Sequence, residues 1–356
     1  MKSRLGVIMK VAIVDVLGLA YDGSTLEKRG LGGSESAVIS IARELNNLGI
    51  DVTIFNDCST DDAIQGNYSG VQYKPLVAAE HAEGFDVVIG SRSLAVFAPD
   101  EIRQHFKTFI GRMPNFDRLI ASAKLKILWL HDTFIDGEQM LEDFLLEGRI
   151  DEVFTLSDFH TDYITNSDHG KKRIFEVMKP YIWQTRNGIN KWLDWVDVSK
   201  KDPNLFVFNS SLTKGMIPLV EQIWPRVKQQ LPDAKLMVIG GFYRFREGVG
   251  PDSQEQRWRE LSQKYGDQIT FTGVIPQKEI AEIMSRASYM IYPCDFPETF
   301  GISALESIYY NTPLITCRFG ALEETAFDLA CYKIPYSVVP NWSVPWLNQD
   351  RQVDIF

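Results

Sequence analysis

The chain has 356 residues, of which 45% are hydrophobic and 12% aromatic, enough apolar material for two packed domains or one large one. Its 37 basic and 47 acidic residues give a formal net charge of −10, which argues against a broad nucleic-acid-binding surface. The four cysteines are scattered, with neither CxxC nor metal-ligand spacing, a usage typical of a reducing compartment.

Residues 5–20 form the first apolar stretch of the sequence. Lys10 and Asp15 interrupt it, so it is interpreted as a first buried strand rather than as a signal peptide. No apolar run in the sequence approaches the length of a membrane span. Together with the cysteine usage, this predicts a cytoplasmic protein.

Strand-like and helix-like patterns alternate along the first half of the chain. Continuous Val- and Ile-rich runs are typical of strands that are covered on both faces. Such runs predict strands at residues 10–16, 51–55, 86–90, 126–130 and 152–156. The alternation with helical segments predicts a parallel, doubly wound sheet of the Rossmann-like kind in an α/β fold.

A glycine pair opens the first helix-like segment. Gly32 and Gly33 precede apolar residues at helical spacing, and Gly49 ends that pattern. The pair would let a backbone or a ligand approach the helix N-terminus closely, whereas a helix cap with a flexible lead-in is the alternative. Residues 15–20, after the first strand, lack the GxGxxG fingerprint of nicotinamide-binding folds, which argues against an oxidoreductase.

His131 directly follows the predicted strand at 126–130. Ligands of open α/β sheets bind at the carboxyl ends of strands, so His131 is a candidate functional residue. The alternative is that His131 has only a structural role. Ser157 is predicted to cap a helix after the next strand. His160 is assigned to packing or to the surface.

Basic and aromatic side chains are interleaved in the segment 101–126. In an acidic protein such a segment could contact an anionic acceptor or the surface of a membrane, as a weak peripheral contact. A solvated helix with a core-facing apolar stripe is the alternative interpretation.

A second alternating series begins after a turn at residues 187–190. Strands are predicted at 205–208, 235–240, 269–272, 289–292 and 313–316, and helices at 217–230, 254–265 and 277–286. We therefore expect two domains, residues 1–190 and 205–356, joined by a linker at 191–204. Two such domains leave a cleft between them in which a ligand can be enclosed.

The stretch from Pro293 to Glu306 connects the strand at 289–292 to a helix at about 302–310. Two prolines and Gly301 preset the turn, and the helix N-terminus behind it suits a phosphate. Glu298 in the turn and Glu306 in the helix are suited to accept hydrogen bonds from sugar hydroxyls. An ordinary strand–turn–helix with two solvated glutamates is the alternative.

Three further positions in the second half lie at predicted strand ends. Lys214 follows the first strand of this half and presents a compact positive charge suited to a diphosphate, although GxxxxGK[ST] is absent. Gly240 and Val274 end the next two strands, where a nucleotide base could lie against the backbone.

The ensemble of these motifs resembles the retaining GT-B glycosyltransferases of family 4, also called glycosyl transferases group 1. The closest feature is the Glu-x7-Glu motif from Glu298 to Glu306. The segments at 311–315 and 320–324 resemble the strand and loop that follow it in that family. The glycine pair, His131, the Asn-Gly-Ile-Asn turn and the Lys-Gly corner occur in the family's order, so that the resemblance spans about residues 10 to 335.

The resemblance implies a GT-B fold, two Rossmann-like domains facing across a cleft, with residues 1–190 on the acceptor side and residues 205–356 binding the nucleotide sugar. It implies that Glu306 holds the ribose hydroxyls and that Lys214 neutralises the diphosphate. The catalytic residues it implies are His131, Lys214 and Glu298. The donor-binding residues it implies are Gly32, Gly33, Lys214, Gly240, Val274, Glu298, Thr299, Phe300, Gly301, Ile302 and Glu306. Neither a metal nor a cofactor is implied.

Two departures from the family pattern accompany the resemblance. Family members commonly carry an arginine about five residues before the lysine, where this chain has residues 209–211, Asn-Ser-Ser. Phosphate neutralisation would then rest on Lys214, the helix N-terminus and Arg244 or Arg246. The family chain usually returns to the first domain through a closing helix, whereas this sequence ends at Phe356. Either the second domain is truncated at its C-terminus or the closing helix is missing.

The function implied is retaining, metal-independent transfer of a sugar from a nucleotide diphosphate sugar to an acceptor hydroxyl, an activity of hexosyltransferase type. UDP is the favoured nucleotide and GDP the next. The acceptor is a glycan, a lipid-linked molecule or a small molecule. One alternative is a nucleotide-sugar epimerase or hydrolase of the same fold, and another is a non-catalytic nucleotide-sugar-binding protein.

Overall fold

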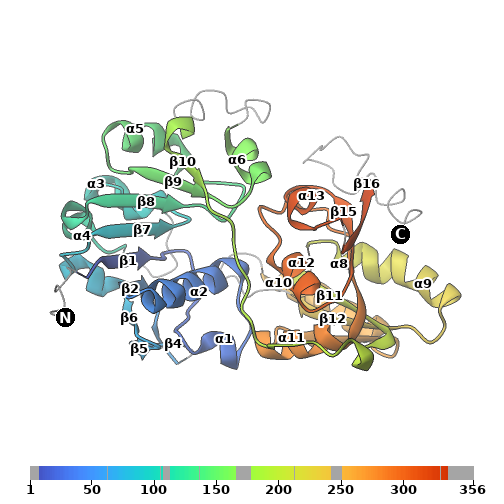
Figure 1. Cartoon of the computed structure of the whole chain (residues 1–356). Coiled ribbons are helices and arrows are strands. Elements are labelled where there is room, and N and C mark those ends of the chain that lie inside the picture. Colours follow the sequence, from blue (N-terminus) through green and yellow to red (C-terminus); the bar gives the residue numbers. More distant parts are fainter. Residues whose placement is uncertain are drawn as a thin grey trace, which may run out of the picture. The chain divides into compact units, whose positions relative to one another are not determined.

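The structure is a computed structural model of the chain (Figure 1). It describes residues 8–61, 63–104, 106, 113–135, 137–165, 178–211, 213–241, 251–328 and 330–335. The chain divides into two compact units. The first comprises Met1–Leu26 and Leu31–Asn187, and the second comprises Glu27–Gly30 and Gly188–Phe356.

The first unit is built on an eight-stranded sheet with the order β10-β9-β8-β7-β1-β2-β6-β5. Its pairs are parallel except for the pair of β5 with β6. Parallel order of this kind requires crossover connections, which the helices between the strands supply. The strands are β1 (Lys10–Val14), β2 (Asp51–Asn56), β5 (Gly66–Tyr68), β6 (Val71–Pro75), β7 (Val87–Ser91), β8 (Leu125–Trp129), β9 (Glu152–Thr155) and β10 (Ile182–Gln184), with a separate two-stranded β3 (Ser59–Thr60) and β4 (Ala63–Ile64).

Helix α2 (Gly33–Asn47) illustrates how the sequence covers this sheet. Val38, Ile39 and Ala42 recur at helical spacing and are buried, while the opposite face is polar. Figure 1 shows α2 beside β2, which it contacts. The other helical elements of this part of the chain are α1 (Thr25–Lys28), η1 (Leu76–His81), η2 (Leu94–Val96), α3 (Asp100–Arg103), α4 (Asp117–Ser122), η3 (Glu138–Met140), α5 (Leu141–Leu146), α6 (Asp158–Thr165) and η5 (Lys179–Tyr181).

The second unit contains a six-stranded, wholly parallel sheet with the order β13-β12-β11-β14-β15-β16. Its strands are β11 (Asp202–Ser211), β12 (Lys235–Gly241), β13 (Ile269–Gly273), β14 (Ala287–Tyr292), β15 (Leu314–Arg318) and β16 (Cys331–Pro335). Its helical elements are η6 (Val198–Lys200), α8 (Met216–Pro218), η7 (Leu219–Ile223), α9 (Trp224–Gln230), α10 (Pro251–Tyr265), α11 (Gln277–Arg286), α12 (Ile302–Tyr309) and α13 (Leu322–Thr325).

Lys201 anchors the start of the second sheet. Its Nζ donates to the main-chain oxygens of Met284, Ala287 and Tyr310, at 3.3, 2.7 and 3.3 Å, and to Oγ1 of Thr312 at 3.1 Å. These oxygens belong to the ends of α11 and α12, where a positive charge is favourable. The interaction joins the entry of β11 to two helix C-termini.

The α/β class, with two parallel sheets, is confirmed. All ten predicted strands are present, and β11 is longer than expected because it begins at Asp202, inside the segment predicted as a connector. Six strands were not indicated by the sequence: β3, β4, β5, β6, β10 and β16. They are short or lie toward sheet edges, where the apolar signal is weak. The described residues contain no helix long and apolar enough to cross a membrane.

Candidate functional site

The connection between β14 and α12 is fixed by close backbone packing. Gly301 caps α12 in the left-handed region, with φ 85° and ψ 61°. Gly320, at φ 61°, lies so near that a Cβ there would be 2.9 Å from both the nitrogen and the oxygen of Glu298. The amide of Ala321 donates to that same oxygen at 2.8 Å. Glycine at 320 therefore allows one loop to hold the other through main-chain contacts.

The corner after β11 packs on the same connection. Gly215 has φ 89°, and a Cβ there would lie 2.1 Å from the carbonyl oxygen of Pro293. This approach brings Lys214 against Glu298, with 2.7 Å between Nζ and Oε1. The hydroxyl of Tyr292 donates to the same carboxylate oxygen at 2.5 Å. Two residues that are 84 positions apart in the sequence thus form one charged pair.

The ion pair changes the chemistry available to each partner. The side chain of Lys214 is 26% exposed and that of Glu298 only 10%, so the ammonium is the more accessible charge. Nζ also lies 4.7 Å from the centre of the Phe296 ring. Both contacts restrict where the ammonium can point. Lys214 can therefore present a positioned positive charge, while Glu298 keeps its second oxygen for another donor.

Glu306 lies on α12 in a different environment. It is 8% exposed, and no other described residue forms a hydrogen bond or an ion pair with its carboxylate. Burial raises the pKa of Glu306 to about 7, because desolvation disfavours the charged form. A buried carboxylate without such partners is stabilised when hydrogen-bond donors, such as sugar hydroxyls, bind to it.

The remaining donor-side candidates lie at strand ends or in the same connection. Thr299 and Phe300 are almost fully buried, and Ile302 begins α12. Gly240, in β12 with φ 98°, would place a Cβ 2.4 Å from the oxygen of Ser210. Val274 follows β13 and is 40% exposed. Arg244 and Arg246 lie outside the described residues, as does the end of the chain at Phe356.

Sequence reasoning missed Asp295. It lies in the connection between β14 and α12, and burial raises its pKa to about 6. Its Oδ1 is buried, and no described residue donates a hydrogen bond to it. The only sequence signal was its place between two prolines in the same turn, which says nothing about burial. Asp295 is therefore a further candidate for contact with a ligand.

A second polar cluster lies at the carboxyl ends of β1 and β7 in the first unit. Arg92, directly after β7, donates from Nη2 to Asp15 Oδ1 at 3.3 Å and to Glu35 Oε1 at 3.2 Å. Burial opposes the charge of Arg92, but the two carboxylates outweigh it and raise its pKa. Burial raises the pKa of Asp15, against the opposing effect of Arg92. Arg92 has φ 67°, a left-handed conformation that is uncommon outside glycine.

Glu35 ties this cluster to the glycine pair. Gly32 is the N-cap of α2, and Gly33 is its first residue. Glu35 Oε1 accepts a hydrogen bond from the amide of Leu19 at 3.2 Å. A Cβ at Gly32 would lie 2.4 Å from Glu35 Oε2, so the absence of a side chain lets Glu35 turn back over the cap. Neither glycine was expected to depend on an acidic partner.

His131 follows β8 at the same edge of the sheet and is buried. Its ring lies 4.3 Å from that of Trp129, centre to centre. Burial lowers the pKa of His131 well below its usual value, and the nearby charge of Arg92 adds to the shift. The imidazole is therefore neutral at physiological pH and can act as a hydrogen-bonding group rather than as a cation.

His160 is a packing residue, as its sequence context predicted. Its Nε2 is 2.9 Å from the oxygen of Asp132, and its Nδ1 accepts from the amide of Leu156 at 3.2 Å. Burial lowers its pKa to about 4. Ser157 caps the helix as expected, because its Oγ accepts from the amide of His160 at 2.9 Å.

Residues 193–330 match the model of the family described as Glycosyl transferases group 1. The matched residues lie within the second unit. A curated protein, "Putative glycosyltransferase YtcC" of Bacillus subtilis (strain 168), is 31% identical over 201 residues. That alignment covers 53% of this chain and 46% of the relative, so the chain matches less than half of that protein's length.

Solved structures show that the whole fold is of the GT-B type. Sucrose-phosphate synthase from Thermosynechococcus elongatus is similar with a TM-score of 0.65 at 17% identity, covering 98% of this chain and 94% of that one. The catalytic domain of starch synthase IV from Arabidopsis thaliana, bound to ADP and acarbose, gives 0.63 at 12% identity with the same coverages. Anabaena HepE in complex with UDP gives 0.56 at 14% identity, covering 92% and 86%.

Proposed function

We propose that this protein transfers a sugar from a nucleotide diphosphate sugar to an acceptor hydroxyl, with retention of configuration and without a metal. The observation that carries the proposal is the Lys214–Glu298 ion pair, which lies on a closely packed connection among the residues that match glycosyl transferases group 1. It combines a positioned positive charge with carboxylate acceptors, as a charged diphosphate next to a sugar requires.

In this proposal each domain binds one of the two substrates. Residues 205–356 bind the nucleotide sugar, and residues 1–190 bind the acceptor on the other side of a cleft. In this proposal the glycine pair at Gly32 and Gly33 closes over the phosphates of the bound donor.

On the donor side, Glu306 accepts hydrogen bonds from the ribose hydroxyls. Its buried carboxylate and raised pKa support this role, because a ribose diol would supply the missing donors. Glu298 uses its second oxygen for the donor sugar. The backbone from Thr299 to Ile302 faces the diphosphate, and Gly240 and Val274 lie beside the base.

In the chemical step, the bond between the anomeric carbon and the diphosphate oxygen breaks, and the acceptor oxygen bonds to the same face of that carbon. The proton of the acceptor hydroxyl passes to the departing diphosphate oxygen. Lys214 and the amides at the start of α12 stabilise the charge that develops on the leaving group. Neutral His131 donates a hydrogen bond to the transferred sugar. A double displacement would require a carboxylate beside the anomeric carbon, and no residue is assigned that role.

UDP is the proposed nucleotide and GDP the next candidate, with a hexose as the transferred sugar. Anabaena HepE has been solved in complex with UDP-glucose, whereas starch synthase IV was solved with ADP, so the fold accommodates more than one base. We propose a cytoplasmic enzyme with a glycan, lipid-linked or small-molecule acceptor. A weak peripheral membrane contact through 101–126, partly outside the described residues, would suit a lipid-linked acceptor.

The test is a screen of nucleotide sugars for thermal stabilisation of the full chain. A ligand at 100 times its Kd adds about 2.7 kcal/mol to the free energy of unfolding, which is readily detected. A donor found in this way is then incubated with acceptors, and transfer and anomeric configuration are read by NMR. No stabilisation by any donor would refute the proposal.

The alternatives have their own signatures in the same experiment. An epimerase or hydrolase of this fold would consume the donor without glycosylating an acceptor. A non-catalytic binding protein would be stabilised by the donor and would leave it intact with every acceptor.

A further inference from the structure

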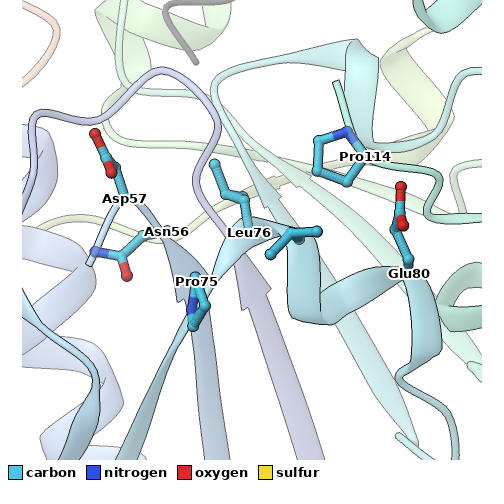
Figure 2. A pocket seen from close by; sticks show the side chains of 7 residues that line it. Asn56, Asp57, Pro75, Leu76, Glu80 and Pro114 are labelled. Carbon is cyan, nitrogen blue, oxygen red and sulfur yellow. The ribbon is translucent and has the colours of Figure 1, made fainter. Parts of the chain in front are cut away.

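A pocket of about 370 Å³ lies in the first unit, where β2 and β6 end (Figure 2). The carboxylates that line it are those of Asp57 and Glu80. Both already interact with other groups of the chain, since Glu80 Oε1 accepts a hydrogen bond from the amide of Asn115 at 3.1 Å and Asp57 has an interaction of its own. In the second unit, by contrast, several side chains converge on one oxygen of a single carboxylate, that of Glu298.

Tyr292 is the most deeply buried member of this network. It is the last residue of β14 and is 1% exposed. Its ring packs edge-on against that of Phe208 on β11, with 5.8 Å between the ring centres and 70° between the planes. On the other side, the hydroxyl of Thr316 on β15 donates to the main-chain oxygen of Tyr292 at 2.8 Å. These contacts with both neighbouring strands fix the position of the phenol hydroxyl.

The single proton of the Tyr292 hydroxyl sets the direction of the hydrogen bonds. The hydroxyl donates to Glu298 Oε1 at 2.5 Å. Burial raises the pKa of Tyr292 well above its usual value, and Cys294 and Glu298 add to the shift, so the phenol keeps its proton. Ser210 Oγ lies 3.2 Å from the same hydroxyl and must be the donor of that pair, because the phenol proton is already used. Ser210 therefore donates to Tyr292, and Tyr292 donates to Glu298.

Glu298 Oε1 receives a second donor of a different kind. Nζ of Lys214 lies 2.7 Å from this oxygen. The ammonium is carried on a flexible four-carbon stem and its side chain is 26% exposed, whereas the phenol is part of a rigid, buried ring. Of the two donors, only the ammonium can therefore turn toward a bound anion. When it does so, Tyr292 remains as a partner for Glu298, so the buried carboxylate is not left without a hydrogen bond.

We propose that Tyr292 is a positioning residue of the transfer reaction, whose hydroxyl holds Glu298 while Lys214 turns to the diphosphate of the donor. The inference rests on the proposed function, and it explains how one lysine can serve both a glutamate and a diphosphate. Without the hydroxyl, Glu298 depends on Lys214 alone and retains it more strongly. The diphosphate then loses part of the positive charge that binds it.

The experiment is a double-mutant cycle of Tyr292→Phe and Lys214→Ala in the full chain. Phenylalanine keeps the ring packing and removes only the hydroxyl. UDP, GDP and ADP are titrated by calorimetry, and the nucleotide that wild type binds most tightly is used for the cycle. Tyr292→Phe should weaken its binding about tenfold in the wild-type background. In the Lys214→Ala background the loss should be less than about twofold, because no ammonium remains to be retained.

The matched control is Tyr309→Phe. The Tyr309 hydroxyl donates to the main-chain oxygen of Leu193 at 3.3 Å, outside the network, so its removal should leave nucleotide affinity unchanged. Thermal unfolding of each variant checks that it is folded. If Tyr292→Phe does not fold, Ser210→Ala provides the test, because it removes only the donor to the Tyr292 hydroxyl. Ser210→Ala should weaken nucleotide binding about threefold, and only when Lys214 is present.

An unchanged affinity of Tyr292→Phe, or an equal loss in both backgrounds, would overturn the proposal. An equal loss is the result that a purely structural role of Tyr292 would produce. If wild type binds one of the three nucleotides but the cycle shows no coupling, only the role of Tyr292 is wrong. If wild type binds none of them, the transferase function is wrong and the role of Tyr292 fails with it.

Discussion

The pKa of Glu306 makes donor binding depend on pH in a way that the structure specifies. Burial raises this pKa to about 7, and the proposed role requires the ionised form to accept the ribose hydroxyls. At pH 8 most of the carboxylate is charged, whereas at pH 5 only about 1% is. Ionising it for binding at pH 5 then costs about 2.7 kcal/mol, at 1.36 kcal/mol for each pH unit. The affinity for the donor should therefore fall by up to about 100-fold between pH 8 and pH 5.

The assay is calorimetric titration of UDP-glucose, whose diphosphate does not change protonation in this range. Glu306→Gln should bind more weakly at pH 8 and should lose most of the pH dependence. Glu323→Gln is the matched control, because Glu323 is an exposed carboxylate of α13 that pairs with Arg318. A slope that remains in Glu306→Gln would point to Asp295, whose pKa is about 6, and Asp295→Asn would remove it. His131 and His160 have lowered pKa values and stay neutral over the range.

The raised pKa of Glu306 also makes the stability of the protein depend on pH. The folded pKa of Glu306 lies above the unfolded value of 4.5, so its contribution to stability is greatest below pH 4.5 and is lost as the pH rises through about 7. The full loss is up to about 3 kcal/mol. Glu306→Gln should therefore gain stability relative to wild type above pH 7. Wild-type donor affinity that does not change with pH, or a Gln variant with the wild-type slope, would refute the reasoning.

Four further outcomes follow from the geometry. Lys214→Ala should lower kcat about 100-fold in steady-state assays with saturating donor, and near-normal turnover would remove Lys214 from the proposed catalytic residues. Gly320→Ala should strain a left-handed position by about 1–2 kcal/mol and displace Glu298, so that donor binding falls more than thermal stability does; unchanged donor affinity would contradict it. Lys201→Met removes a charged donor from four oxygens and should lower the free energy of unfolding, measured in urea, by about 2–3 kcal/mol. A free energy of unfolding equal to that of wild type would contradict this. Arg92→Met leaves two buried carboxylates without their cation and should lower the free energy of unfolding by about 3–5 kcal/mol. A denaturation midpoint equal to that of wild type would show that other groups stabilise the carboxylates.

The sequence by itself determined the class of the fold and most of the strands. Parallel strands such as β1, β2 and β12 are covered on both faces, so their Val- and Ile-rich runs stand out in the sequence without any tertiary information. The sequence also predicted the turn before α12, because two prolines restrict the backbone there and Gly301 permits the left-handed conformation that precedes the helix. These signals depend on neighbours in the chain.

Only the tertiary structure decided which side chains meet. Lys214 and Glu298 are 84 residues apart, and their contact exists because Gly215 and Gly320 let separate loops approach the same connection. The burial of Glu306 and Asp295, and hence their raised pKa values, depends on what packs around them. Arg92 between Asp15 and Glu35 gave no sequence signal, because an arginine after a strand looks the same whether it is solvated or paired. Packing between residues far apart in the sequence sets the pairing and the protonation of these side chains. Local sequence patterns do not contain that information.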